Sequence, residues 1–501
     1  MADQEHLIEE NRESDVKLGR ITEITEEKIK DLNEQPKPEE KKLESYRVIF
    51  SIWNTMLGSS ILSNPYNVYS AGIIPTILFG ILYGLICFLS CSVVVKLSGN
   101  EEDFSVVVYN YLFYSQGLKA AKIGKYLQII FNLLMNIGAT FIYFLLINQN
   151  LYPCLCLLLR LFNVDLDDSD KTPHFDKFSP FYCALIISAL VFPLTIKKEI
   201  HFLQKMNSLG VIVVLLILGF IIYVGIDSLA RDTFHFEYKE NKVGIKDRNL
   251  YLFGENPGLI TGMYSLGLFS HSFILPYMKN NKNPKNNTRD LFIGYLLVTL
   301  TFIIIGLMGY IGFSGSKYST KFEQNFFLFF PSDDYFAFVL RILSVFQLLT
   351  IFPILFFIVR TQLFSTFFKS YNNKTTPIII FSVVLFFFCF LILIFLYDSL
   401  ADLIGYIGAG TALILVYTLA PLINMIDYYI RHQPAKEIEK IKEKKDEYLI
   451  FINVEDLKPL IPWKAFIFYM GMILIIILGI ITLLLQIIPS NLFNIKIEKS
   501  G

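Results

Sequence analysis

Long apolar blocks are the feature of this sequence that most limits what it can fold into. A helix needs about 20 apolar residues to cross a hydrocarbon core of roughly 30 Å, so blocks of this length predict membrane-spanning helices. We therefore expect an all-α membrane protein with eleven transmembrane helices. The expected spans cover residues 46–68, 73–97, 124–150, 178–196, 207–226, 257–278, 290–313, 335–358, 377–397, 400–427 and 463–488.

The remaining composition agrees with this organisation and excludes several other classes. Residues 1–45 are rich in Glu, Lys, Asp and Asn and predict a disordered tail, ahead of a transmembrane domain over 46–488 and a short tail over 489–501. The formal net charge of +0 gives no overall field to attract nucleic acid. The six cysteines show neither zinc spacing nor a disulfide framework. No nucleotide loop, zinc cluster or hydrolase elbow offers enzymatic chemistry.

The distribution of basic residues predicts the orientation. If the amino terminus is cytosolic, the cytosolic connections hold about 31 of the 44 Lys and Arg residues, including the basic segment 431–464. The short far-side loops at 69–72 and 398–402 hold none. We therefore expect a cytosolic amino terminus and a non-cytosolic carboxyl terminus. Residues 104–122 mix apolar side chains with Ser, Gln and Lys and predict an interfacial segment.

The first apolar block is interrupted by Asn54-Thr55-Met56-Leu57-Gly58-Ser59-Ser60. A helix in lipid must satisfy its own backbone polar groups, so a break is tolerated only where protein or a water-filled cavity surrounds it. Gly58 permits backbone angles that other residues resist, and the neighbouring hydroxyls can bond freed carbonyls or a ligand. The alternative is an unbroken helix with small polar packing residues, which are common in membranes.

The sixth block carries a second group of small polar residues, Ser265 to Ser272, followed by Pro276. Interrupted spans at matching positions of two halves are the best sequence pointer to a transporter's midplane site. The two interruptions lie in the first and sixth spans, which predicts a five-plus-five inverted repeat with broken helices 1 and 6, plus an extra helix. Freed amides at a half-helix start bind a carboxylate, and freed carbonyls at a half-helix end bind an ammonium or Na⁺. A zwitterionic amino acid suits such paired ends.

Three other polar residues inside the blocks leave alternatives open. Arg341 is a functional candidate by its cost in a membrane, but it lies near a span end, where its side chain can snorkel to the surface. Thr350 can line an ion site or bond to its own helix backbone. His271 can pair, titrate or fill the bend in the sixth span.

The run from Trp53 to Pro65 resembles the first-span signature of the amino acid/auxin permease superfamily. More closely, the chain is similar to lysosomal members of that superfamily that transport and sense arginine. Two later stretches also resemble this superfamily. One runs from Asn286 to Leu291, and the other is a set of residues from Glu323-Gln324-Asn325-Phe326 through Arg341 and Thr350 to Leu363. The similarity covers most of residues 46–430.

The resemblance implies roles for the residues of the first break. Thr55, Met56, Leu57, Gly58, Ser59 and Ser60 match positions that contact the substrate backbone in the superfamily. Asn54, the carbonyl of Leu57 and Thr350 match a Na⁺ site, although other members of the superfamily use protons. No acidic residue in the broken spans marks a pocket for a cationic side chain, so arginine and neutral amino acids both remain open as substrates.

Two functions follow as hypotheses. The first is a secondary active amino-acid transporter of an endolysosomal membrane that works by alternating access, with Na⁺ as the coupling ion. The second is an amino-acid receptor that scarcely transports and signals through its cytosolic segments. The lysosomal relatives engage nutrient-signalling machinery through a long amino-terminal tail. Here about 45 residues precede the first span, and they are rich in charge rather than in aromatic side chains.

Overall fold

Helices make up most of the described part of the chain. The computed structural model describes residues 42–58, 60–99, 101–162, 173, 177–197, 210–231, 234–239, 249–314, 322–331, 334–368, 374–432 and 461–487. The expected tails, apart from residues 42–45, lie outside these ranges, and so do Ser59 and most of the basic segment 431–464.

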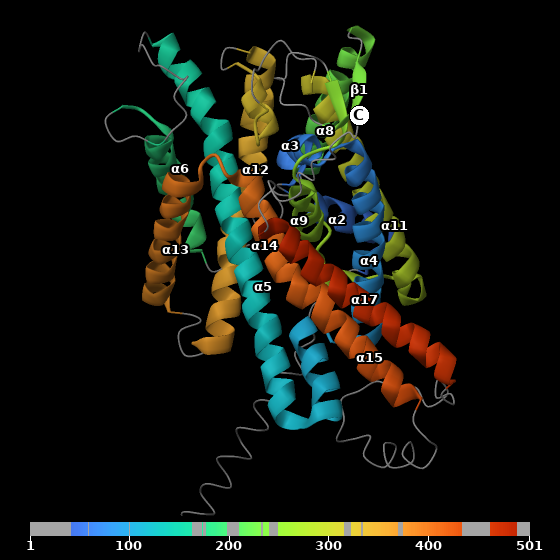
Figure 1. Cartoon of the computed structure of the whole chain (residues 1–501). Coiled ribbons are helices and arrows are strands. Elements are labelled where there is room, and N and C mark those ends of the chain that lie inside the picture. Colours follow the sequence, from blue (N-terminus) through green and yellow to red (C-terminus); the bar gives the residue numbers. More distant parts are fainter. Residues whose placement is uncertain are drawn as a thin grey trace, which may run out of the picture.

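The helices run roughly along one direction and form an elongated bundle (Figure 1). Eight of the described helices are long and apolar, and in lipid the backbone of each must satisfy its hydrogen bonds within the helix. The α-helices are α2 (Ser45–Leu57), α3 (Ser60–Ala71), α4 (Ile73–Leu97), α5 (Phe104–Leu161), α6 (Pro180–Thr195), α8 (Gly210–Arg231), α9 (Pro257–Gly267), α10 (Ile274–Lys279), α11 (Asn287–Ser314), α12 (Tyr335–Phe367), α13 (Thr375–Leu396), α14 (Leu400–Ile414), α15 (Ala420–Arg431) and α17 (Pro462–Ile487). Short 3-10 turns η2 (Pro284–Asn286) and η3 (Phe326–Phe329) precede α11 and α12, and a π-helical turn η5 (Leu415–Leu419) joins α14 to α15.

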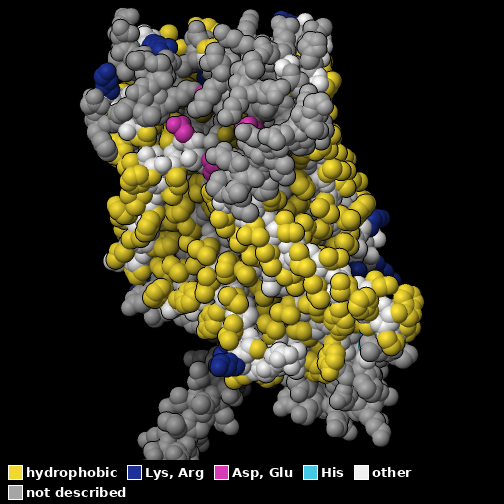
Figure 2. All heavy atoms as spheres, in the orientation of Figure 1, with side chains coloured by type: hydrophobic (Ala, Val, Ile, Leu, Met, Phe, Trp, Pro, Cys, Tyr) yellow, Lys and Arg dark blue, Asp and Glu magenta, His cyan; other side chains and the backbone are white. Residues whose placement is uncertain are grey.

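Eight helices in the described ranges are long and apolar enough to cross a membrane. Figure 2 shows hydrophobic side chains over the middle of one face, while the charged side chains visible there lie above it, below it or at its right-hand edge. Large apolar residues point outward along these helices, among them Leu78 of α4 and Phe395 of α13. An outward apolar surface of this size fits a lipid environment. The chain is therefore an integral, multi-pass membrane protein.

The segment expected at the membrane interface forms a separate helix at the start of α5. Gly117 has a φ of 80° and a ψ of −176°, which divides α5 into residues 104–116 and 118–161. The first part begins at Asp103, whose carboxylate accepts a hydrogen bond from the Ser105 amide at 2.8 Å. Figure 1 shows this first part beside the lower end of the long second part.

Two short strands were not expected in this helical chain. β1 (His235–Lys239) and β2 (Asn249–Phe253) pair in parallel between α8 and α9. The chain after β2 satisfies the last carbonyls of α3, because the amides of Gly254 and Asn256 donate to Ala71 and Ser70 at 2.8 Å. The strand pair therefore anchors one end of α3.

The chain ahead of α2 is joined to the chain that follows α10. The amide of Leu43 donates to the carbonyl of Asn280 at 2.7 Å, and the amide of Lys282 donates to the carbonyl of Leu43 at 2.8 Å. An ion pair of 2.7 Å between Glu44 and Lys282 reinforces this bridge and raises the pKa of Lys282. The outer ends of α2 and α10 are thus held together.

Candidate functional site

The first break lies at Gly58 and at the undescribed Ser59. Gly58 has a φ of 24° and a ψ of −146°, a conformation that L side chains rarely adopt. The interruption was expected to begin at Asn54, but α2 continues through Leu57. Within it the Thr55 hydroxyl donates to the carbonyl of Ser51 at 2.7 Å, as a hydroxyl in an intact helix does. The break is therefore narrower than the polar run that predicted it.

The second break spans residues 268–273, between α9 and α10. The Ser270 hydroxyl lies 2.7 Å from the hydroxyl of Tyr295 on α11. His271 is fully buried, with Nε2 2.9 Å from the Ser90 hydroxyl of α4, which donates to the Val416 carbonyl in η5 at 2.9 Å. His271 therefore links the bend of the sixth span to α4 and η5.

The two breaks face each other. On one side of them, which we name the α2 side, α2 packs against α10 and the hydroxyls of Thr55 and Tyr277 lie 3.3 Å apart. On the opposite side, the α3 side, α3 packs against α9. A Cβ on Gly267 would lie 3.5 Å from the Ser60 hydroxyl, at van der Waals contact, so the start of α3 lies beside the end of α9.

Half-helix ends supply the electrostatics of this region. Two helices end here, α2 and α9, and two begin here, α3 and α10. The described residues of both breaks include no Asp, Glu, Lys or Arg. Partial positive charge at the helix starts and partial negative charge at the helix ends therefore act without a competing side-chain charge. Such a pair of ends matches a molecule that carries one carboxylate and one ammonium group.

The residues expected at the substrate and the ion lie around the first break in different settings. Met56 and Leu57 point into the core, Thr55 is exposed, and Ser60 is buried at the first residue of α3. Asn54 presents a buried side-chain oxygen that has no hydrogen-bond partner.

Thr350 is buried in α12. Its hydroxyl donates to the carbonyl of Gln347 at 2.7 Å, which leaves the lone pairs of its oxygen available. No hydrogen bond joins it to Asn54 among the described residues. No group of three or more His, Cys, Asp or Glu side chains that could hold a metal occurs there either. Any cation at these positions would therefore be held by neutral oxygens, which suits a monovalent ion better than a transition metal.

Polar residues of α5 and α12 also reach the second break, and the sequence did not single them out. The Ser272 hydroxyl donates to the side-chain oxygen of Asn132, and the Asn132 amide donates to Gln362 at 3.3 Å. Asn132 and Ser272 are half-buried, whereas Ser60 and Ser265 are fully buried. The region around the breaks is thus more accessible from the α2 side than from the α3 side.

A polar network closes the α3 side. The Asn325 amide donates to the side-chain oxygens of Gln149 and Asn150, at 3.1 and 2.9 Å. Arg341 donates to the carbonyls of Phe327 and Phe330, both at 2.6 Å, and its side chain is only 1% exposed. Arg341 does not snorkel; it holds the turn η3 in place. The sequence could not distinguish these roles because the carbonyls that receive Arg341 belong to a loop.

We predict that Arg341→Met destabilises the protein by about 3 kcal/mol, because two buried carbonyls lose a charged donor. Thermal unfolding of the purified protein measures this change. Arg231→Met is the matched control, since the Arg231 side chain is 71% exposed. Equal melting temperatures for the two variants would contradict the structural role of Arg341.

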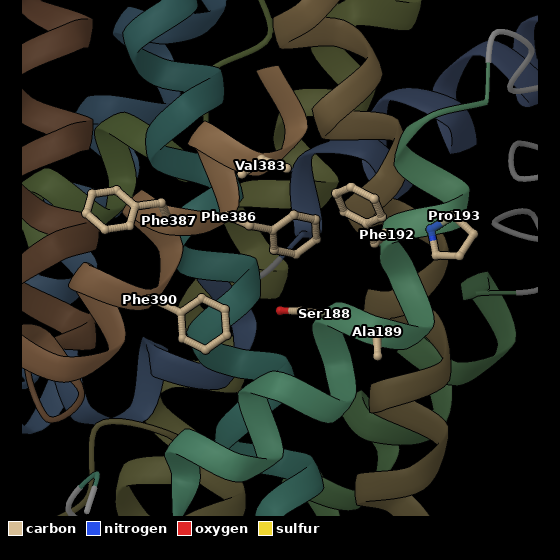
Figure 3. Close-up of a pocket in the computed structure, with 8 residues that line it drawn as sticks. All are labelled: Ser188, Ala189, Phe192, Pro193, Val383, Phe386, Phe387 and Phe390. Atoms are coloured by element: carbon tan, nitrogen blue, oxygen red, sulfur yellow. The ribbon is translucent and has the colours of Figure 1, made fainter. Parts of the chain in front are cut away.

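A separate hollow of about 440 Å³ lies between α6 and α13 (Figure 3). Its lining is apolar apart from the Ser188 hydroxyl and includes four aromatic rings, Phe192, Phe386, Phe387 and Phe390. Phe387 is largely exposed on the outer surface of α13. No group in this lining can balance the charges of a zwitterion, so the hollow is not a site for an amino acid.

Comparison with known protein families shows to which family the chain belongs. Residues 41–454 match the family described as transmembrane amino acid transporter protein. The chain belongs to this family. It is the amino acid/auxin permease family that the first-span signature indicated, and its members are transporters rather than enzymes.

Individual relatives agree with the family. Neutral amino acid transporter 9 of Xenopus tropicalis is 28% identical over 432 residues, which cover 77% of this chain and 74% of the relative. The sodium-coupled neutral amino acid transporter 9 homolog of Caenorhabditis elegans is 26% identical and covers 82% of this chain and 72% of its own. A solved nucleobase-cation-symport-1 family transporter aligns over 90% of this chain and 93% of its own, with 13% identity and a TM-score of 0.49.

Proposed function

We propose that this amino-acid transporter works by alternating access, with its substrate held where the two broken spans face each other. The observation that carries the proposal is the meeting of two half-helix starts and two half-helix ends in a region without charged side chains. In this arrangement the start of α3 binds the carboxylate of an amino acid, and the ends of α2 and α9 bind its ammonium. Thr55 to Ser60 surround the substrate backbone.

The eleven expected spans fit this proposal when each broken pair counts as one span. The α2–α3 pair and the α9–α10 pair join α6 and the eight long apolar helices. The first five and next five spans then form inverted repeats, and α17 is the extra span. In the inverted repeat of a transporter, one repeat element rocks against the other around a fixed site.

Uptake of labelled amino acids into proteoliposomes tests the function. The proposal predicts uptake above protein-free vesicles for neutral amino acids, for arginine, or for both. The names of the relatives support neutral amino acids, and the uncharged lining of the breaks agrees with them. Specific binding without any flux would contradict transport and indicate a receptor with the same pocket. The membrane proposed for the protein is endolysosomal, which localisation of the tagged chain tests.

Sodium is the proposed coupling ion, held by Asn54, the Leu57 carbonyl and Thr350. The unpartnered oxygen of Asn54 and the free lone pairs of Thr350 support this assignment. Bound Na⁺ would contribute a positive charge near the end of α2, and its gradient would supply the driving force.

We predict that replacing Na⁺ with choline lowers uptake. We also predict that Thr350→Val raises the Na⁺ concentration for half-maximal uptake about tenfold, because the ion loses one ligand worth about 1.4 kcal/mol. The control is Thr411→Val. Like the Thr350 hydroxyl, the Thr411 hydroxyl donates to a carbonyl of its own helix, that of Ile407 at 2.6 Å. Undiminished uptake in choline would remove the proposed roles of Asn54 and Thr350 while leaving transport itself intact.

A further inference from the structure

The half-helix α3 carries two asparagines with side-chain hydrogen-bonding groups that find no partner among the described residues. Asn64 and Asn67 are both fully buried. The Asn64 amide donates to the carbonyl of Phe302 at 2.6 Å, but its side-chain oxygen has no partner. For Asn67, neither the side-chain oxygen nor the side-chain nitrogen has a partner in the part of the chain that the structure describes.

An amide in this condition is costly. A carboxamide offers two donors and an acceptor, and burying it without partners is unfavourable, all the more so in a segment surrounded by lipid and protein. A leucine has the same branched arrangement of four side-chain heavy atoms and would not carry this cost. The state captured here therefore gains nothing from the amide of Asn67.

The position of Asn67 on α3 shows which face of the helix it occupies. At 3.6 residues per turn, Asn67 lies about 20° from the direction of Ser60, two turns along α3. Ser60 faces Gly267 of α9, next to the second break. Pro65 and Val68 instead face α11, where Cβ atoms on Gly309 and Gly306 would meet them at 2.3 and 2.6 Å. Asn67 therefore lies on the face of α3 that leads from the break toward the α3 side.

We propose that Asn67 lines the water-filled passage that opens on the α3 side, and that its amide binds water in that state. The inference rests on the alternating access proposed above. In the structure described here the α3 side is closed, and the amide is buried without a hydrogen-bond partner among the described residues. When α3 separates from its neighbours, water satisfies the amide, which lowers the free energy of the open state relative to the closed one. Asn67 is then a positioning residue that sets the balance between the two states.

Cysteine reactivity tests the inference without knowledge of the substrate. In a variant whose six native cysteines, all buried, are replaced by alanine, Asn67→Cys is treated with a charged, water-soluble methanethiosulfonate. Val68→Cys is the matched control, because Val68 is equally buried but faces α11. We expect Asn67→Cys to react about ten times faster, because only its face becomes hydrated in the open state. Equal rates at the two positions would overturn the inference.

Asn67→Leu supplies a second measurement that does not depend on labelling. Leucine removes the unmet hydrogen bonds of the closed state and the hydration of the open one. We expect a higher melting temperature and slower maximal uptake, with little change in the amino-acid concentration for half-maximal uptake. A lower melting temperature would mean that the amide has a partner in the closed state, and would overturn the inference. Fast labelling at position 67 without any uptake would count against the proposed transport function and support the hydration of Asn67.

Discussion

We expect Ser60→Trp to weaken amino-acid binding about 100-fold, below detectable uptake, while the protein still inserts and folds. Ser60 begins α3 and lies against Gly267 of the second break, with only 4% of its surface exposed. An indole in this position fills the space where the substrate carboxylate meets the start of α3. Loss of a charged hydrogen bond and a second contact, about 3 kcal/mol together, corresponds to roughly 100-fold weaker binding.

Binding of labelled amino acid to the purified protein measures this effect. Leu78→Trp is the matched control, because Leu78 is 61% exposed on the outer surface of α4. A monodisperse elution profile for both variants separates loss of the site from loss of the fold. Wild-type affinity in Ser60→Trp would mean that the substrate binds elsewhere.

Gly58→Val is expected to lower both stability and uptake. The φ of 24° at Gly58 is strained for any residue with a Cβ, at a cost of about 1–3 kcal/mol, and a β-branched side chain is the least tolerant. A Cβ at this position would also lie 3.3 Å from the Tyr143 hydroxyl. The backbone at the break must then change conformation, and the end of α2 and the start of α3 are no longer both directed at the proposed substrate site. We expect uptake to fall at least tenfold, as about 1.4 kcal/mol of lost substrate stabilisation would produce.

The control for this variant is Gly219→Val. Gly219 lies within α8, has helical backbone angles, and would place its Cβ more than 4 Å from any neighbour. Melting temperatures and initial uptake rates of the two variants are compared with the wild type. If Gly58→Val transports normally, the backbone of the first break does not form the site.

The long apolar helices and the positions of both interruptions could be predicted from the sequence because lipid imposes simple rules. Apolar length fixes a span, and the expected block 73–97 coincides with α4. Small polar residues in the middle of a span indicate a break, but they do not fix its bounds. Thr55 remains helical because its hydroxyl bonds within its own helix, whereas the backbone leaves the helix at Gly58, whose φ of 24° a residue with a Cβ rarely adopts.

Contacts between distant segments could not be predicted in the same way. Asn132 and Ser272 lie 140 residues apart, and only the fold reveals that they meet. The strand pair β1–β2 was missed because its segments are short and lie between polar residues. Arg341 was ambiguous because its partners are backbone carbonyls, which no side-chain pattern records.

The central claim is that an amino acid crosses the membrane through the region between the two breaks. The most direct measurement is uptake of a panel of labelled amino acids into proteoliposomes that contain the wild-type protein or Ser60→Trp, with and without a Na⁺ gradient. We expect the wild type to take up at least one neutral amino acid or arginine, and this uptake to depend on Na⁺. We expect no uptake above empty vesicles by Ser60→Trp. Equal uptake by the two proteins would contradict it, as would binding by the wild type without any flux.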